Sequence, residues 1–189
     1  MGFFSDFFDF VGEIFEEVIS WIIPTPEIPD FGDLQQDKNA QGVLVNKFQS
    51  NASIPIVYGT RKVGGNVVFL ETSGASNTHL YMVLVLSEGE IDDITTIFVN
   101  DNPVTWSGDL ADNTERTVAS NDANFFKDSA SLITVRPHFG ADDQTQDSLV
   151  GELSSWTSNH RLRGLAYLSL KFTWNQDAFG SIPTVQALV

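Results

Sequence analysis

The chain has 189 residues, enough for one full domain with a substantial core, and its 42% hydrophobic and 12% aromatic content is typical of a folded protein. The net charge of −15 argues against the concentrated basic surface that DNA or RNA binding requires, and it disfavours binding to anionic lipid. The absence of cysteine excludes disulfides, thiolate metal sites and cysteine nucleophiles.

The first element along the chain is an apolar and acidic segment at residues 3–23. Its pattern predicts an amphipathic α-helix, because at roughly 100° per residue the large apolar side chains fall on one side and the acidic ones on the other. At about 1.5–3 kcal/mol for each large side chain removed from water, we expect another surface to cover this apolar side. The expected contact residues are Phe3, Phe4, Phe7, Phe8, Val11, Ile14, Phe15, Val18, Trp21 and Ile22.

Three surfaces could cover the apolar side: the chain's own domain, another subunit or partner, or a membrane surface. Contact with a membrane surface is disfavoured, because interfacial helices usually carry Lys or Arg opposite the apolar face, and here those positions are acidic. A transmembrane span is excluded by the five carboxylates within the segment. The absence of a basic residue before the apolar run argues against a secretory signal. The first two surfaces remain open.

Pro24, Pro26 and Pro29 end the predicted helix, because an internal proline loses a hydrogen bond and clashes with the preceding turn. We therefore expect three regions: a helical arm at 1–24, an extended proline-rich connector and loop at 25–41, and a β-rich domain at 42–189. A stiff connector of polyproline type would hold the arm away from the domain, which favours contact with another chain.

Strand-like sequence fills the third region. We expect strands at residues 42–48, 54–59, 61–74, 79–87, 94–100, 103–106, 132–140, 162–174 and 181–189. Residues 79–87 are apolar almost without alternation, which predicts a strand covered on both faces near the centre of a sheet. The adjacent Gly64 and Gly65 indicate a bulge, a tight turn or a close backbone approach, and residues 100–102 indicate a hairpin turn.

A short helix is expected at residues 147–156, with Asp147 or Ser148 as its cap. Its side chains at Leu149, Val150, Leu153 and Trp156 should point inward. The predicted fold class is therefore α+β: a mostly antiparallel β domain preceded by an N-terminal amphipathic helix and a proline-rich connector.

The sequence contains little that predicts chemistry. His79, His138 and His160 lie far apart without carboxylates at metal-ligand spacing, and the chain has no GxSxG, phosphate-binding or GxGxxG motif. Carboxylates such as Glu88 and Asp92 do not match a calcium loop. We therefore expect no catalytic residue, no metal and no cofactor, and take the protein to be no enzyme.

Three passages resemble the tail hub proteins of long-tailed bacteriophages, a family that includes the lambda-type tip attachment proteins and the hubs of gene transfer agents. Residues 54–65, IPIVYGTRKVGG, resemble the family's I-P-x-V-Y-G-x-x-x-V-G-G signature. Residues 84–104 are similar to its strand, acidic-glycine turn and second strand. Residues 162–189 resemble its closing segment, with G-x-A-Y at 164–167 and F-G-x-I-P at 179–183. The passages occur in the family's order.

The resemblance implies a structural virion protein at the distal end of the phage tail, made in the host cytoplasm. Such a protein would form a ring with other copies of itself, three-fold in the family, and would close the tail tube. It would contact distal tail or tip ring proteins and the tape-measure protein, and DNA could pass through the ring without specific binding. The motif residues would shape the backbone: Ile54, Pro55, Tyr58, Gly59, Gly64, Gly65, Gly180 and Pro183.

Family members commonly continue into further hub domains and a receptor-binding region, which this chain does not. Either the remainder is on another polypeptide, or only the leading hub region is present here, so host recognition is not assigned to this chain. Two alternative functions remain. A carbohydrate-active or hydrolytic tail-tip module would need two carboxylates around a cleft, for which Glu88, Glu90, Asp92 and Asp93 are the candidates. A membrane-active protein would act through residues 1–24.

Overall fold

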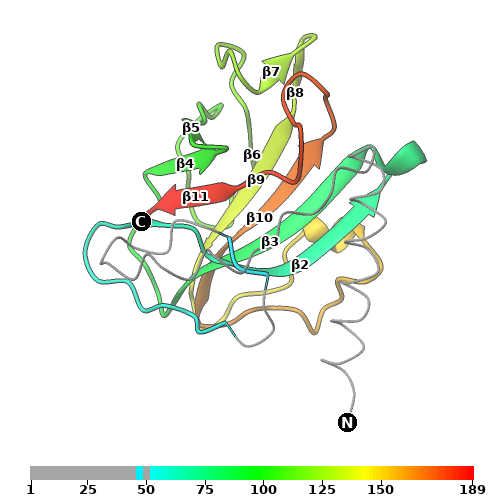
Figure 1. Cartoon of the computed structure of the whole chain (residues 1–189). Coiled ribbons are helices and arrows are strands. Elements are labelled where there is room, and N and C mark those ends of the chain that lie inside the picture. Colours follow the sequence, from blue (N-terminus) through cyan, green and yellow to red (C-terminus); the bar gives the residue numbers. More distant parts are fainter. Residues whose placement is uncertain (1–45, 49–51) are drawn as a thin grey trace, which may run out of the picture.

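In the computed structural model, which describes residues 46–48 and 52–189, the chain is built from antiparallel β-sheets (Figure 1). The five-stranded sheet has the order β2 (Asn66–Ser73), β3 (His79–Glu88), β10 (Leu165–Thr173), β9 (Ile133–Phe139) and β6 (Arg116–Thr117). The four-stranded sheet has the order β1 (Lys62–Val63), β11 (Val185–Leu188), β4 (Thr96–Val99) and β5 (Asn102–Pro103). A small ribbon joins β7 (Phe126–Lys127) and β8 (Ala130–Ser131).

The main hydrophobic core lies between the two larger sheets. Along β3 the side chains of Met82, Leu84 and Leu86 enter this core, where they meet residues of β4, β10 and β11. The intervening Val83 and Val85 point to the opposite face of the five-stranded sheet and belong to a second apolar cluster. Because both faces are covered, β3 contains no polar alternation. The prediction for residues 79–87 is confirmed, although β10 and not β3 occupies the middle position.

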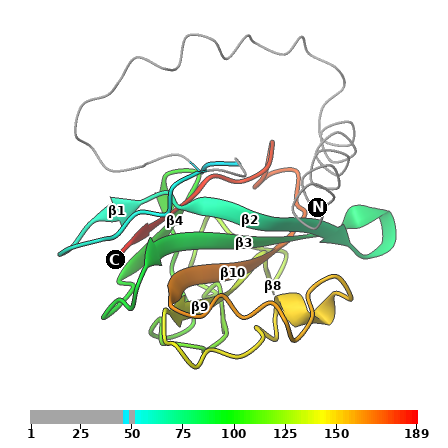
Figure 2. The ribbon, with the colours of Figure 1, turned by 90° about the horizontal axis from the view of Figure 1, so that it is seen from below.

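The second cluster is covered by the chain between β9 and β10, which we call the covering loop (residues 140–164). Figure 2 shows this loop, in yellow and orange, beneath the larger sheet. Its Trp156 ring packs edge-on against Phe69 of β2, with 5.1 Å between ring centroids. Its Val150 and Leu153 are buried beside Trp156. The five-stranded sheet therefore has an apolar layer on each side.

Gly64 and Gly65 form the corner at which the chain leaves one sheet and enters the other, between β1 and β2. Gly65 has a φ of +62°, and a Cβ atom placed there would lie 2.6 Å from the carbonyl oxygen of Val85. Only glycine combines this left-handed backbone with such a close approach. The expectation of a turn or close approach at the glycine pair is confirmed.

The hairpin predicted around residues 100–102 is also confirmed. It joins β4 to β5, with Val99 opposite Asn102 and a two-residue turn at Asn100 and Asp101. Both turn residues have positive φ, 49° and 63°. These angles are those of a type I′ turn, which asparagine and aspartate tolerate better than other non-glycine residues.

The predicted α+β class is wrong, since the described residues form an antiparallel β domain in which the only helical elements are two 3₁₀ turns, Ala75–Asn77 and Val150–Glu152. The helix expected at 147–156 is reduced to the second of these turns. The N-cap position is occupied by Leu149, without a side-chain capping hydrogen bond, so the expected cap at Asp147 or Ser148 is wrong. Asp147 still accepts a hydrogen bond from the Val150 N–H, and Gly151 weakens helix formation. The inward positions of Leu149, Val150, Leu153 and Trp156 are confirmed.

Two further expectations concern the N-terminal part. Residues 54–58 belong to no strand, and Gly59 lies in a bend with a φ of +65°, so the strand expected at 54–59 is wrong. Pro55 lacks an N–H group, and the segment forms only isolated hydrogen bonds with Ser87 and Glu88 of β3. The helical arm at 1–24 and the connector at 25–41 lie outside the described residues, so both remain predictions.

Candidate functional site

A buried polar cluster under the covering loop contains serine, histidine and aspartate. Asp147 Oδ2 lies 2.6 Å from His138 Nε2 and accepts a hydrogen bond of 2.7 Å from Ser169 Oγ. In a nucleophilic triad the histidine stands between the serine and the carboxylate, whereas here the carboxylate stands between the other two. All three side chains are buried, so this cluster joins the loop to β9 and β10 and is not a catalytic site.

The electrostatics of the cluster agree with a structural role. Burial by itself would raise the pKa of Asp147, but hydrogen bonds from His138, Ser169 and the Val150 N–H outweigh it, and the pKa lies below its ordinary value. The neighbouring Tyr167 ring stacks on His138 at 4.2 Å between centroids. Burial, followed by the charge of Asp147, raises the pKa of Tyr167 and keeps its hydroxyl neutral. The loop is therefore held by an ionised, well-bonded carboxylate.

A second polar group fastens the 3₁₀ turn to the sheet from outside. Glu152 Oε2 accepts hydrogen bonds from Lys171 Nζ at 2.8 Å and from the Tyr81 hydroxyl at 2.7 Å. The Lys171 hydrogen bond is the main reason that the pKa of Glu152 is lowered. These side chains satisfy one another, which leaves none of them poised for acid–base chemistry.

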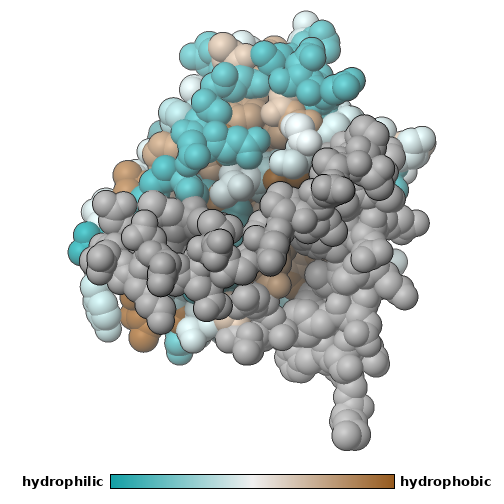
Figure 3. All heavy atoms as spheres, viewed as in Figure 1, coloured by the Kyte–Doolittle hydropathy of each residue, from teal (hydrophilic) through white to brown (hydrophobic). Residues whose placement is uncertain are grey.

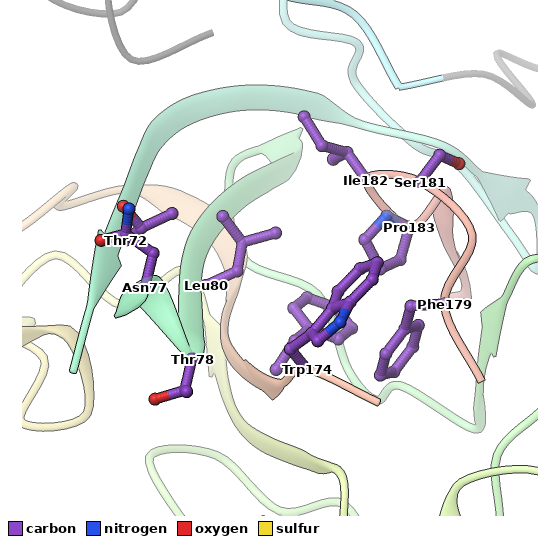
Figure 4. A pocket seen from close by; sticks show the side chains of 10 residues that line it. Thr72, Asn77, Thr78, Leu80, Trp174, Phe179, Ser181, Ile182 and Pro183 are labelled. Carbon is purple, nitrogen blue, oxygen red and sulfur yellow. The ribbon is translucent and has the colours of Figure 1, made fainter. Parts of the chain in front are cut away.

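The described residues line one small cavity worth considering as a ligand site. It lies beside the tip of the β2–β3 hairpin, and Leu80, Trp174 and Phe179 point toward it (Figure 4). Its volume is about 20 Å³, about the size of a single water molecule. Small-molecule sites usually enclose about 300–1,000 Å³, so this cavity is a packing defect and not a substrate pocket.

The candidate carboxylates Glu88, Glu90, Asp92 and Asp93 are exposed around the turn that follows β3. Asp93 is used locally, where it accepts a hydrogen bond from the Ile94 N–H. Within the described ranges no group of histidine and acidic side chains could hold a metal ion. In the same part of the chain no helix is long and apolar enough to cross a membrane.

The most distinctive surface of the described chain is the extended stretch before β1, which we call the rim segment (residues 46–48 and 52–61). It contains the exposed large hydrophobic side chains of the described residues: Phe48, Ile56 and Tyr58, with exposed fractions of 40%, 57% and 82%. In Figure 1 the cyan trace before β1 loops outward beside the C-terminal end. Exposed apolar side chains gathered on one segment mark an interaction surface more often than a catalytic one.

Hydrogen bonds hold the rim segment in place although it is not a strand. The Glu88 N–H donates to Pro55 O at 2.9 Å, and Arg61 forms a pair of backbone hydrogen bonds with Val189. Asn46 anchors the start of the segment: its side chain donates to the carbonyl oxygens of Gly64 and Val185 and accepts from the Val185 N–H. The exposed side chains are therefore presented on a fixed backbone.

The structure separates the motif residues that the sequence grouped. Ile54, Pro55, Tyr58 and Gly59 lie on the rim segment, and Gly64 and Gly65 form the adjoining sheet corner. Pro183 lies elsewhere, at the cavity beside the β2–β3 hairpin, three residues after Gly180. Sequence reasoning did not single out Ile56 or Phe48. The sequence shows the alternation of Ile54, Ile56 and Tyr58, but alternation alone does not tell which of these side chains the rest of the chain buries.

The expected contact residues of the N-terminal arm, Phe3 to Ile22, lie outside the described residues, and their role stays a prediction. For the described residues, fold and surface together define an antiparallel β protein with exposed apolar side chains on the rim segment.

Comparison with known proteins agrees with this class. No protein-family model matches the chain. The chain is 22% identical over 175 residues to the baseplate hub protein pb3 of Escherichia phage T5, an alignment that covers 72% of this chain and 18% of that protein. Its fold is similar to a chain of the virion of a native gene transfer agent particle, with a TM-score of 0.54 and 13% identity over 100% of this chain and 38% of the other. The chain thus spans about a fifth of the hub protein.

These similarities support the predicted resemblance in its coarse form, that of a phage tail or baseplate type of protein. They do not single out the lambda-type tip attachment proteins within that class.

Proposed function

We propose that this chain is a structural, non-enzymatic protein of the tail hub or baseplate in a phage-like particle. Copies of it form a ring, three-fold as in the family that it resembles, at the distal end of the tail. The ring closes the tail tube, contacts distal tail or tip ring proteins and the tape-measure protein, and lets DNA leave without binding it specifically. The chain is made in the host cytoplasm and ends in the virion.

The observation that carries the proposal is the sequence similarity to a baseplate hub protein over 72% of the chain. The fold similarity to a chain of a gene transfer agent virion, over the whole length, supports it independently. The exposed apolar rim segment also fits, because a protein that works inside an assembly must present surfaces to its neighbours.

The net charge of −15 is consistent with a conduit. A wall of negative potential would repel phosphates and would not retain DNA in transit.

Deletion and imaging of intact particles test the proposal. We expect purified particles from the producing strain to contain the chain at the tail end, seen by mass spectrometry and by cryo-electron microscopy. Deleting its gene should give particles that lack a closed tail end and do not transfer DNA, and wild-type protein supplied from a plasmid should restore both. Intact particles without the chain, or a deletion strain with normal tails, would overturn the proposal.

A hydrolytic function finds no support in the described residues, where the candidate carboxylates are exposed around a turn and none of them lines the cavity beside the β2–β3 hairpin. The expected result of replacing Glu88, Glu90, Asp92 and Asp93 together is unchanged infectivity. Loss of DNA transfer with normal particle assembly would favour the hydrolytic reading.

A further inference from the structure

The rim segment is basic in a strongly acidic chain. Residues 46–63 contain Lys47, Arg61 and Lys62 and no acidic residue, whereas the whole chain has 25 acidic and 10 basic residues. Lys62 is partly engaged, 3.9 Å from an Asp101 carboxylate oxygen and over the Phe98 ring. Arg61 is exposed, and its backbone is fixed by the pair of hydrogen bonds to Val189. Positive charge therefore borders the exposed apolar side chains.

The rim segment carries exposed apolar side chains and basic side chains close together in sequence. Ile56 and Tyr58 lie within five residues of Arg61, and Phe48 adjoins Lys47. The stretch is held at several points, since Lys47 bonds to Gly65 and Val67 through its backbone and the Asn66 side chain donates to Ser53 O. Figure 3 shows hydrophobic atoms at the lower edge of the described surface, the end where the rim segment lies in Figure 1. A preorganised backbone loses little entropy when it binds.

We propose that the rim segment is the docking surface for the N-terminal segment, residues 3–23, of a neighbouring copy of this chain. That segment has the complementary composition: large apolar side chains, five carboxylates and no basic residue. Its aromatic side chains would cover Ile56 and Tyr58, and its carboxylates would face Arg61 and Lys47. In such a contact the apolar side chains are buried, and the complementary charges fix the register between the two partners. The inference rests on the proposed function, because it assumes that copies of the chain assemble with one another.

The length of the connection allows the occupant to come from a neighbouring copy. Ile56 and Tyr58 remain 57% and 82% exposed within one chain. Residues 24–45 provide 22 residues of connection, which extended would span at most about 75 Å. A domain of this size has a radius of gyration of roughly 15 Å, so the connection is long enough to reach an adjacent copy.

Photo-crosslinking of the full-length chain tests the proposal. p-Benzoylphenylalanine is placed at position 58, and ¹⁵N-labelled and unlabelled copies are mixed before irradiation. We expect mass spectrometry to find position 58 joined to peptides from residues 1–23, with labelled and unlabelled partners combined. The control carries the same probe at Asn159, which is exposed on the covering loop, and should give no such product. Crosslinks within one copy only, crosslinks to other regions, or none would each overturn the proposal.

The strength of self-association in substituted chains gives a second test of the docking surface. Tyr58→Ser should weaken self-association about 30-fold if Tyr58 is a central contact, and Arg61→Glu about fivefold, measured by analytical ultracentrifugation. Combining Arg61→Glu with Glu13→Lys should restore part of the loss, whereas the control Arg161→Glu should have no effect. Circular dichroism verifies that each variant folds, which is expected at positions 58, 61 and 161 because Tyr58, Arg61 and Arg161 are exposed. Unchanged association for Tyr58→Ser would contradict the docking surface.

The two proposals fail in different ways. If the chain is found at the tail end of particles but position 58 does not reach residues 1–23, the docking surface is wrong and the proposed function stands. If position 58 does reach residues 1–23 of another copy but particles lack the chain, the contact stands and the proposed function is wrong.

Discussion

Asp147 is fully buried and yet ionised, because three donors from separate elements converge on its carboxylate: His138 on β9, Ser169 on β10 and the Val150 N–H of the covering loop. Charges in protein interiors are stable only when such partners replace water. The residue thereby ties a long loop to two strands that are distant from it in sequence. Its importance is structural, and it can be measured through its dependence on pH.

Asp147→Asn is expected to lower the free energy of unfolding by about 3 kcal/mol at pH 7, since it removes the charge that His138 and Ser169 stabilise. The pKa of Asp147 is lowered in the folded protein, so its contribution is present above the unfolded pKa of about 4 and is lost as pH falls through the folded value. Urea unfolding at pH 7 and pH 3 should show a smaller loss of stability on acidification in the variant. Asp143→Asn, at an exposed carboxylate of the same loop, should match the wild type at both pH values.

Gly65→Ala tests the sheet corner. The alanine Cβ would lie 2.6 Å from Val85 O at a φ of +62°, so we expect a loss of about 2–4 kcal/mol in the free energy of unfolding. Gly59→Ala has a similar φ of +65° but open space around it, and should lose only about 1 kcal/mol. Gly180→Ala has neither constraint and should be nearly neutral. Thermal unfolding measures the three losses. Equal losses for all three variants would contradict the assignment of Gly65 to a sterically tight corner between the two sheets.

At the scale of elements, the covering loop carries no regular structure beyond one 3₁₀ turn, and yet it completes the molecule. It supplies Val150, Leu153 and Trp156 to the outer face of the five-stranded sheet. Without this layer, the side chains of Val83 and Val85 on β3 would meet solvent. The loop is thus a structural layer that is held by the Trp156 ring on Phe69 and by the hydrogen bonds of Asp147 and Glu152.

Trp156→Ala is expected to loosen the covering loop, because it removes the ring that packs on Phe69 and leaves a cavity costing about 3–5 kcal/mol. Trypsin should then cleave faster after Arg161 and Arg163, which lie at the end of the loop. Ser154→Ala, an exposed change in the same loop, serves as the control. Wild-type cleavage rates in Trp156→Ala would show that the polar attachments alone hold the loop.

At the scale of the whole molecule, the described residues form two packed sheets with exposed large apolar side chains on the rim segment, while residues 1–33 carry eight of the 25 acidic residues and no basic one. This division suits a subunit that joins to copies of itself. A chain of this kind is expected to show its full stability only in the assembly, because binding between copies adds to the stability of each one.

Phe7→Ser combined with Phe15→Ser is expected to block tail assembly while the domain at residues 42–189 stays folded, because the change removes apolar surface from the proposed contact and alters no residue of the described strands. Particle yield and infectivity measure the first effect, and circular dichroism of the purified chain measures the second. Ser20→Ala, a polar position of the same segment, is the matched control. Normal assembly of the double variant would show that these phenylalanines do not join subunits.

Much of the β framework could be predicted from local sequence. A long apolar run predicted β3, strand-like sequence at 162–174 predicted β10, and residues 100–102 predicted the hairpin, because each signal lies within a few residues. The α+β class and the helix at 147–156 were wrong, since the inward spacing of Leu149, Val150 and Leu153 fits a loop pinned to a sheet as well as it fits a helix. The polar cluster was missed, because Asp147, His138 and Ser169 come from three separate elements.

By itself, the sequence determined that the chain is acidic, free of cysteine and rich in strands, and that glycines bend it at residues 64–65, since these are properties of composition and near neighbours. The tertiary structure decided which strands share a sheet, that a loop covers the outer face, and that Ile56 and Tyr58 stand exposed while Ile54 is partly covered. The physical reason is that burial depends on what lies across from a side chain, and those residues come from distant parts of the chain.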